Sequence, residues 1–206
     1  LAPASRYPPS AEDPRLSNIV EALPGANCGA CGYAGCRAYA EAVVEGEDVG
    51  LCSVGGQEVA ETIADIMGVE VEDLGDRRAV VHCQGSRDCC PPRADYDGIE
   101  DCRAADVVSG GHKSCVYGCL GLGSCAEECP FDAITMGEDG LPHIDPEKCT
   151  ACGVCVRTCP RDLITLLDSR FTTYLGCSSN DSGKDVKNVC DVGCIACGIC
   201  EKKDPH

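Results

Sequence analysis

The chain has 206 residues, of which 21 are Cys and 24 are Gly; Trp is absent and aromatic residues make up 4%. Bulky apolar side chains are therefore too scarce for a single-core enzyme of the doubly wound or barrel type, and groups bound by the cysteines must add to stability. The formal net charge of −17 opposes non-specific attraction to nucleic acid. Docking on basic faces of partner proteins and simple solubility both remain as explanations of this charge.

The sequence contains neither a membrane span nor a secretory signal. No stretch reaches the roughly 18–20 consecutive apolar residues of a span, and the first residues lack the apolar core of a signal peptide. The cysteines are therefore better explained as ligands of metals or clusters than as extracellular disulfides. Because the sequence begins at Leu1 rather than Met, we expect a leading segment to be missing, and that segment could hold a membrane anchor.

The first part of the chain predicts a tether followed by a small helical unit. Residues 1–13 are rich in Pro, Ser and Ala and form the tether. Apolar residues at helical spacing predict helices over 14–23, 37–45 and 57–67. With the cysteines between them these helices form a domain over 14–70, which is small enough to need a metal.

The middle of the chain combines predicted strands with cysteine runs. A connecting segment over 71–110 has extra cysteines, a predicted strand at 79–83 and a predicted helix at 101–108. Residues 111–168 hold two cysteine runs that each end in Cys-Pro, and they predict a ferredoxin-like domain with two [4Fe-4S] clusters. The candidate strands of this domain are 133–136, 143–145 and 163–167.

The tail over 169–206 is predicted to hold one strand after Phe171, a turn rich in Gly and Lys, and a last cysteine run. The expected fold class is α+β. It consists of a small cluster-stabilised helical domain, a ferredoxin-like domain with two [4Fe-4S] clusters and a partial ferredoxin-like tail.

Two internal repeats organise the cysteines. The first relates residues 125–134 to 155–164, and both copies contain Cys-Pro followed by an apolar strand candidate. The second relates residues 115–130 to 190–205, with Cys83 matching Cys177 upstream. The tail is therefore interpreted as a partial copy of the middle of the chain.

The run from Cys149 to Pro160 has the spacing of bacterial ferredoxins, in which three cysteines hold one cluster and the fourth binds another. Zinc is usually held instead by two separated pairs of ligands. The partner run has Leu122 where a cysteine is expected, so Cys115 is the natural substitute. The predicted ligand sets are Cys115, Cys119, Cys125 and Cys159 for one [4Fe-4S] cluster, and Cys129, Cys149, Cys152 and Cys155 for the other.

A third set of ligands lies in the helical domain, where a Gly-rich loop is followed by a helix and a returning cysteine. This arrangement can enclose a third [4Fe-4S] cluster. Zinc, free thiols and a redox dithiol are the alternatives. The predicted ligands are Cys28, Cys31, Cys36 and Cys52.

The tail repeats the ferredoxin triplet, but Asp204 stands where the fourth cysteine belongs. A fourth cluster would take its last ligand from Cys190, from Cys177 or from residues beyond His206. A fifth cluster built from left-over cysteines and a set of scattered buried thiols are both open. The tail set is Cys190, Cys194, Cys197 and Cys200; the left-over cysteines are Cys83, Cys89, Cys90, Cys102 and Cys177, with Cys83, Cys102 and Cys177 the best candidates for ligands.

No catalytic triad, phosphate-binding loop or isolated carboxylate pair is present in the sequence, so the available chemistry is one-electron transfer along clusters. Three segments occur in a characteristic order before the ferredoxin runs. They are Leu-Pro-Gly-Ala-Asn-Cys28-Gly-Ala-Cys31-Gly-Tyr-Ala-Gly-Cys36, Gly-Ile-Glu-Asp-Cys102 and Cys115-Val-Tyr-Gly-Cys119. From residue 13 onward, the chain resembles the B subunit of the Rnf ion-translocating ferredoxin:NAD oxidoreductase, in its long, cluster-rich form.

The resemblance implies an electron-transfer subunit of a translocase, without a catalytic site beyond its clusters. Such subunits accept electrons from reduced soluble ferredoxin and pass them to other subunits of a membrane complex that moves Na⁺ or H⁺ and reduces NAD. It also implies a location on the cytoplasmic side of the cell membrane and an N-terminal membrane helix, which is absent from this sequence.

Two other functions compete with this expectation: a soluble polyferredoxin that carries electrons between cytosolic enzymes, and a zinc-dependent interaction scaffold. A ferredoxin donor is itself acidic and would be repelled by the average charge of the chain, so we expect a local basic docking patch. Its candidates are Lys113, Lys184 and Lys187, for which ordinary solvated surface lysines are the alternative explanation.

Overall fold

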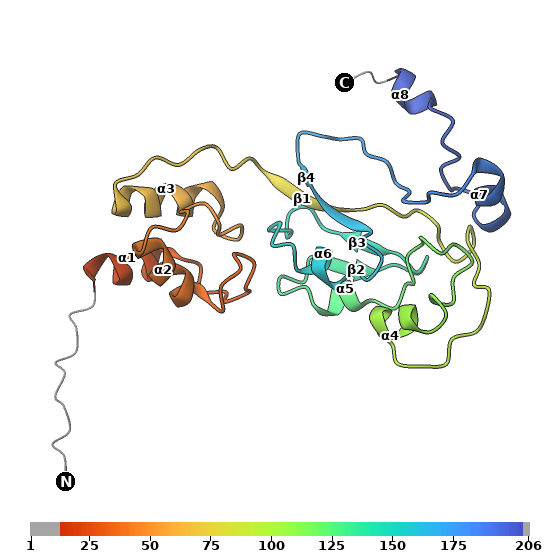
Figure 1. The fold of residues 1–206 in the computed structure, drawn as a ribbon, viewed down its shortest axis with the longest axis horizontal. Helices are drawn as coiled ribbons and strands as arrows, with labels where there is room; N and C mark the ends of the chain where they lie inside the picture. The colour runs from red at the N-terminus through yellow and green to blue at the C-terminus, as the bar shows by residue number, and fades with distance from the viewer. Residues whose placement is uncertain (1–12, 204–206) are drawn as a thin grey trace, which may run out of the picture. The chain divides into compact units, whose positions relative to one another are not determined.

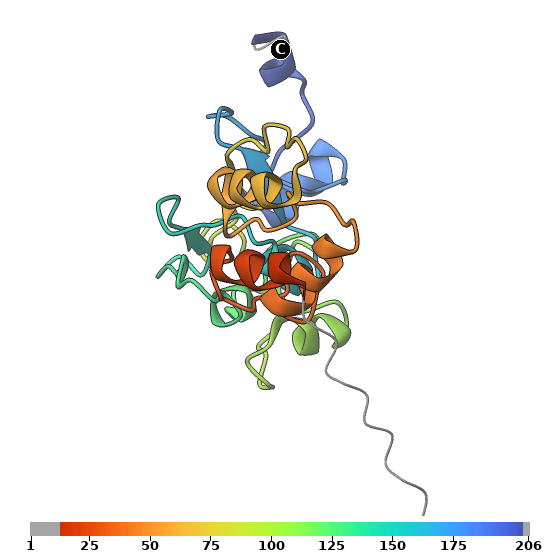
Figure 2. The ribbon, with the colours of Figure 1, turned by 90° about the vertical axis from the view of Figure 1, so that its left-hand side faces the viewer.

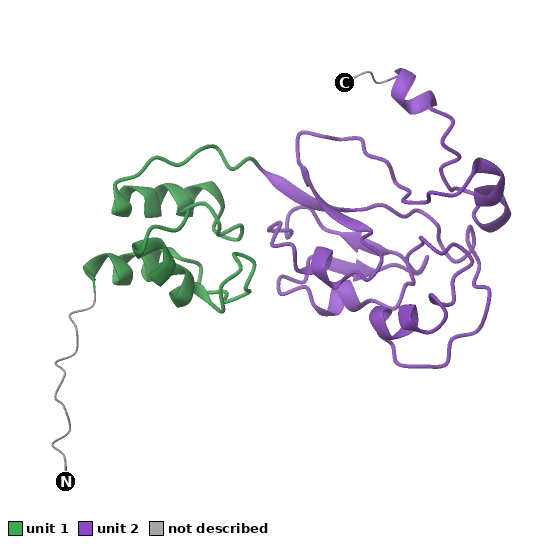
Figure 3. Cartoon of the chain, in the orientation of Figure 1, with its two compact units in different colours: residues 1–75 green, residues 76–206 purple. Residues whose placement is uncertain are grey.

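The computed structural model describes residues 13–203, which form two compact units (Figure 3). Unit 1 ends at Gly75, and unit 2 begins at Asp76 and brings the connecting segment, the ferredoxin-like runs and the tail together. The predicted tether lies outside the described residues except for Asp13. Within residues 13–203, none of the helices has the length and apolar character needed to cross a bilayer.

Unit 1 consists of the helices α1 (Pro14–Ala22), α2 (Cys36–Val44) and α3 (Gly56–Met67), which confirm the predicted helices to within one residue. α1 packs against both α2 and α3 (Figures 1 and 2). It begins where Asp13 accepts a hydrogen bond of 2.9 Å from the backbone N–H of Arg15. The small core between the helices contains Leu16, Ile19, Leu23, Tyr39, Ala40, Val43, Val49, Ile63 and Ala64.

Tyr39 is the largest side chain fully buried in this core, and it also ties the returning loop to α2. Its hydroxyl donates a hydrogen bond of 2.8 Å to the carbonyl of Asp48 and accepts one of 3.2 Å from the N–H of Leu51. These bonds satisfy two partly buried backbone groups in the loop that leads to Cys52. Tyr39 thereby positions the loop that returns the last cysteine of this unit.

Unit 2 is built on two small antiparallel sheets (Figure 1). β1 (Arg77–Val81) pairs with β4 (Ile164–Asp168), and β2 (Ile134–Met136) pairs with β3 (Pro142–Ile144). These four strands confirm the strand candidates, with bounds shifted by one or two residues. Their inner faces form a core that includes Ala79, Val81, Ile134, Leu141, Leu163 and Ile164.

The first internal repeat is present as a repeated backbone conformation. α5 (Ser124–Glu127) and α6 (Val154–Thr158) each follow a glycine in the left-handed region, with φ of 81° at Gly123 and 71° at Gly153. Glycine carries no Cβ and adopts this conformation without strain. The two copies therefore begin their helices in the same way.

The remaining helices are α4 (Cys102–Val107), α7 (Gly183–Val189) and α8 (Ile199–Lys203). α4 confirms the predicted helix at 101–108. The predicted tail strand is wrong: no residue between Phe171 and Lys203 lies in a strand. This segment is bonded to earlier parts of unit 2 by an isolated bridge from Cys177 to Cys83 and by the N–H of Asp191, which donates a hydrogen bond of 2.9 Å to the carbonyl of Cys89.

The predicted Gly- and Lys-rich turn of the tail is also wrong, because that segment is α7. Ser182 caps this helix by accepting a hydrogen bond of 3.4 Å from the N–H of Asp185. Val186 is 1% exposed and anchors α7 to unit 2. A serine cap and one buried apolar residue are enough to order seven residues that lack an apolar repeat.

We predict that Tyr39→Phe lowers the free energy of unfolding of unit 1 by about 1–2 kcal/mol, because a partly buried backbone N–H and a partly buried carbonyl lose their partner. Urea titration of the anaerobically purified chain, followed by circular dichroism, measures this change. Tyr33→Phe is the control, since the Tyr33 hydroxyl bonds to the exposed carboxylate of Glu47. Equal effects of the two substitutions would contradict the role given to Tyr39.

Candidate metal centres

Most of the cysteines line four cavities with volumes between about 320 and about 410 Å³. Within residues 13–203, no three His, Cys, Asp or Glu side chains converge closely enough to hold a single metal ion. The thiols lie instead on the cavity walls. A four-iron, four-sulfide cube binds one thiolate at each iron, so its ligands must surround a volume in this way.

The cavity of unit 1, about 320 Å³, is lined by the four predicted cysteines of that unit. Asn27 holds the loop closed, since its Oδ1 accepts a hydrogen bond of 2.9 Å from the N–H of Cys36. Gly35 makes room for this side chain, because a Cβ there would lie 2.7 Å from the same oxygen. The sequence analysis assigned no role to Asn27. The four cysteines are Cys28, Cys31, Cys36 and Cys52.

A second cavity, about 330 Å³, lies in unit 2. It is lined by the last cysteine of the first ferredoxin-like run and by the first three cysteines of the second run. The backbone N–H of Ala79, on β1, donates a hydrogen bond of 3.5 Å to Sγ of Cys149. Burial and the neighbouring thiols raise the pKa of Cys155 to about 11. The structure brings together Cys129, Cys149, Cys152 and Cys155, the set expected from the spacing.

The third cavity, about 390 Å³, differs from the expected set in one position. Cys119, Cys125 and Cys159 line it as expected, but the fourth cysteine is Cys102, and Cys115 lines another cavity. Burial raises the pKa of Cys119 and that of Cys125 to about 12, and the thiol of Cys102 is among the neighbours that raise both values.

A hydrogen-bond network brings Cys102 to this cavity. Asp101 caps α4 by accepting a hydrogen bond of 2.7 Å from the N–H of Ala104. The hydroxyl of Ser124, at the start of α5, donates to the Asp101 carboxylate (3.0 Å) and accepts from the N–H of Cys102 (2.8 Å). Cys102 is thus held beside Cys125. Spacing relates only cysteines within one run, so the sequence does not indicate this contact between distant segments.

The residues of these three cavities fit [4Fe-4S] clusters. Each cavity offers four thiols and no competing carboxylate or imidazole. Backbone N–H groups point at sulfur, as at Cys159, which accepts a hydrogen bond of 3.4 Å from the N–H of Leu163. The raised pKa values mean that the positive charge of bound iron must drive formation of the thiolates.

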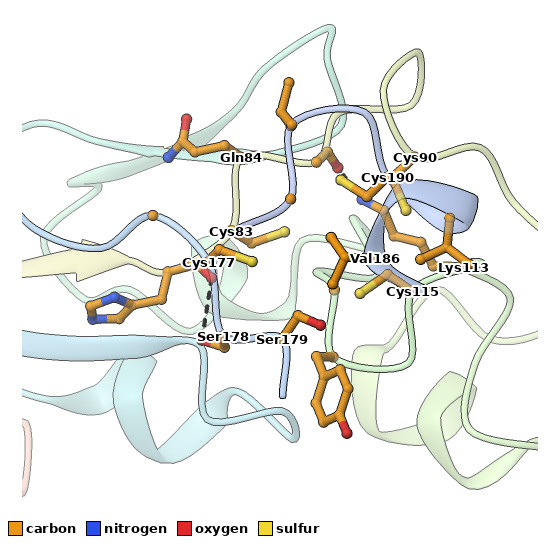
Figure 4. Close-up of a pocket in the computed structure, with 18 residues that line it drawn as sticks. Cys83, Gln84, Cys90, Lys113, Cys115, Cys177, Ser178, Ser179, Val186 and Cys190 are labelled. Atoms are coloured by element: carbon orange, nitrogen blue, oxygen red, sulfur yellow. Dashed lines mark hydrogen bonds between the residues drawn. The ribbon is translucent and has the colours of Figure 1, made fainter. Parts of the chain in front are cut away.

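A fourth cavity, about 410 Å³, is lined by five cysteines from four separate segments of unit 2 (Figure 4). Three of them, Cys83, Cys90 and Cys177, belong to the cysteines that the sequence left without a cluster, but Cys102 does not join them. Cys190, expected to complete the tail set, also lines this cavity. The five cysteines are Cys83, Cys90, Cys115, Cys177 and Cys190.

The tail triplet of Cys194, Cys197 and Cys200 repeats the backbone of the ferredoxin triplet. Ala196 and Gly198 have φ values of 53° and 67°, matching 53° and 71° at Ala151 and Gly153. Cys197 and Cys200 are exposed. Asp204, where the fourth cysteine of the repeat is missing, lies outside the described residues.

The prediction of a basic docking patch is wrong for one of its three lysines. Lys113 is only 7% exposed, and its ammonium group donates a hydrogen bond to the carbonyl of Gly85. It therefore cannot contribute to a docking surface. Lys184 and Lys187, on α7, are exposed.

Comparison with known proteins places iron–sulfur modules in both units. Residues 23–54 match a family model described as a putative Fe-S cluster, and residues 142–165 match a model of a 4Fe-4S binding domain. These matches cover the cavity of unit 1 and the second ferredoxin-like run.

Similarity to whole proteins extends over most of the chain. The B subunit of the ion-translocating oxidoreductase complex of Methanosarcina acetivorans is 50% identical over 94% of this chain and 74% of the relative. The B subunit of the Na(+)-translocating ferredoxin:NAD(+) oxidoreductase complex of Acetobacterium woodii is 48% identical over 89% of this chain and 55% of the relative. The B subunit of the proton-translocating ferredoxin:NAD(+) oxidoreductase complex of Clostridium ljungdahlii is 42% identical over 88% and 65%, respectively.

We predict that Cys102→Ser removes the cluster of the third cavity, with a loss of about four iron atoms per chain, while Cys115→Ser leaves that cluster in place. Iron analysis together with electron paramagnetic resonance of the reduced protein distinguishes the two variants. Loss of the same signal in Cys115→Ser but not in Cys102→Ser would support the ligand set expected from the spacing instead.

A second prediction concerns the crossing between the two runs. Cys129→Ser should damage the cluster of Cys149, Cys152 and Cys155, because Cys129 lines their cavity, and should leave the cluster of Cys119 and Cys125 intact. The resonance spectrum of the variant is the measurement. Damage confined to the latter cluster is the outcome that excludes the crossed arrangement.

Proposed function

The chain belongs to the family of B subunits of ion-translocating oxidoreductase complexes, and on this premise we propose that it conducts electrons through a series of [4Fe-4S] clusters into a membrane-bound complex. Three cavities, each lined by four cysteines, are the observation that carries this proposal. The proposed ligands are the cysteines of those cavities. The ferredoxin-like domain then holds two of the clusters, and unit 1 holds the third.

Contacts in unit 2 support electron transfer between neighbouring sites. α5 and α6 pack against each other and carry Cys125 and Cys155, which line different cavities. The thiol of Cys155 is also among the neighbours that raise the pKa of Cys125. Two clusters held by these residues would therefore lie next to each other, as one-electron transfer requires.

The protein supplies position and electrostatics. When bound, a [4Fe-4S] cluster accepts and releases a single electron, with a potential set by its surroundings. The small cores exclude water from the inner thiols, and Cys155 is 7% exposed. The N–H groups of Ala79 and Leu163 donate to ligand sulfurs, which stabilises the more negative, reduced state.

Reduced soluble ferredoxin is the proposed donor, and other subunits of a membrane complex are the proposed acceptors. The relatives from Acetobacterium woodii and Clostridium ljungdahlii are named as ferredoxin:NAD(+) oxidoreductase subunits, one Na(+)-translocating and the other proton-translocating. We also propose a location at the cytoplasmic side of the membrane, as the family resemblance implies. No contact in the described residues favours a zinc scaffold or a free polyferredoxin over this function.

The test is anaerobic reduction of the purified chain by a small acidic ferredoxin, followed as bleaching of the visible iron–sulfur absorbance. We expect reduction within the mixing experiment and at least three clusters of four irons each. A colourless protein, or a coloured one that ferredoxin does not reduce, would contradict the proposal. A triple variant, Cys28→Ser with Cys102→Ser and Cys129→Ser, is the control because it removes one thiol from each of the three cavities.

We predict that Lys184→Glu with Lys187→Glu slows ferredoxin-dependent reduction by about tenfold at low salt, because an acidic donor approaches an acidic chain most readily over its exposed cations. Salt should reduce the difference between variant and parent, since screening acts over about 8 Å at physiological ionic strength. Arg77→Glu with Lys148→Glu makes the same change of charge at other exposed positions. Equal slowing by both pairs would remove the α7 patch from the mechanism.

A further inference from the structure

We propose that Cys83, Cys115, Cys177 and Cys190 hold a further [4Fe-4S] cluster, in a site built jointly by the middle of the chain and its tail. The inference rests on the proposed function, because it adds a site to the same series of clusters. The residues come from the segment after β1, the first cysteine run, the tail segment before α7 and the end of α7.

The cavity itself resembles the other three. Its volume of about 410 Å³ is close to the 390 Å³ of the cavity that Cys102 lines. In Figure 4 the labelled cysteines lie around one space, with no carboxylate among the labelled side chains. Burial raises the pKa of the Cys115 thiol most, and the thiols of Cys83, Cys190 and Cys177 raise it further.

Four of the five thiols form two matching pairs, each with one cysteine from the middle of the chain and one from the tail. Cys83 and Cys177 face each other in an isolated antiparallel bridge. Cys115 is followed three residues later by Gly118, whose Cβ would lie 3.3 Å from the Cys115 Cβ. Cys190 is followed in the same way by Gly193, with a corresponding distance of 3.4 Å. The second sequence repeat relates the same positions, so each half supplies two equivalent ligands.

Cys90, the fifth thiol, has no counterpart in the other half. It is 1% exposed and accepts a backbone hydrogen bond from Cys115, so it supports the wall of the cavity. Gly85 lies at the point where the halves meet. A Cβ at Gly85 would be 3.3 Å from Sγ of Cys190 and 3.9 Å from Sγ of Cys83. Glycine therefore lets sulfurs from both halves approach the same space.

Lys113 is an independent indication that this cavity binds an anion. Its side chain lines the cavity and is 7% exposed, and its ammonium group donates to the carbonyl of Gly85. In the described part of the chain no carboxylate forms an ion pair with it. A buried cation without a counter-charge is costly. A cluster with four thiolate ligands is anionic and supplies that charge.

The site is directly linked to the third cavity. The backbone N–H of Cys119, a residue that lines the third cavity, donates a hydrogen bond of 3.3 Å to Sγ of Cys83. One residue thus contacts both sites. Cys125 and Cys155 bring the second and third cavities together in the same way. Unit 2 therefore has three adjacent sites in a row, formed by the second, third and fourth cavities.

The experiment is iron and sulfide analysis of the anaerobically purified full chain carrying Cys83→Ser with Cys177→Ser. We expect about four iron atoms fewer than in the parent, with the resonances of the other clusters retained. Cys89→Ser is the matched control because Cys89 adjoins Cys90 but lines none of the four cavities. Cys90→Ser should also retain the parent iron content. Unchanged iron in the double variant would overturn the proposal.

Two further variants keep the proposal testable if the double variant fails to fold. Gly85→Val retains every thiol but fills the space between the halves, so it should also lose about four iron atoms. Lys113→Met should lower the reduction potential of the cluster in this cavity more than that of any other cluster, because it removes a cation from the cavity wall. Parent-like iron in Gly85→Val and parent-like potentials in Lys113→Met would together exclude the site. A parent chain with clusters that ferredoxin cannot reduce would instead contradict the proposed function.

Discussion

Bonds between cysteine and iron are the interaction on which this structure depends, because its apolar cores are small. Unit 1 buries little more than one face of each of three short helices, and unit 2 rests on two sheets of two strands each. An isolated pair of strands is marginally stable in water. The iron–sulfur modules matched in both units therefore act as cross-links as well as cofactors.

Much of the fold could be predicted from local patterns. Apolar spacing located the helices of unit 1, and the Cys-Pro repeats located β2 and β4. The errors are in the tail, where tertiary contacts decide the conformation. α7 is held by one cap and by the burial of Val186, and the expected strand is reduced to a single bridge at Cys177.

The family resemblance read from the cysteine motifs is confirmed by relatives that share 42–50% of their residues with the chain. Ligand spacing is less informative where the chain departs from a regular run. It could not distinguish Cys102 from Cys115, because the choice depends on the network of Asp101 and Ser124 between distant segments. Local motifs specify a loop that can bind a cluster, whereas long-range packing decides which thiol completes it.

The positions of the cavity cysteines along the chain determine the order in which the cavities can be completed during synthesis. All four thiols of unit 1 are present once residue 52 has been made, and the cavity of Cys102 is complete at residue 159. The cavity shared by the middle and the tail must wait for Cys190. Until then the cavity lacks Cys190, so the thiols of Cys83 and Cys115 are not enclosed by the tail. A ribosome that stalls between residues 159 and 190 therefore leaves a chain with one open, thiol-rich face.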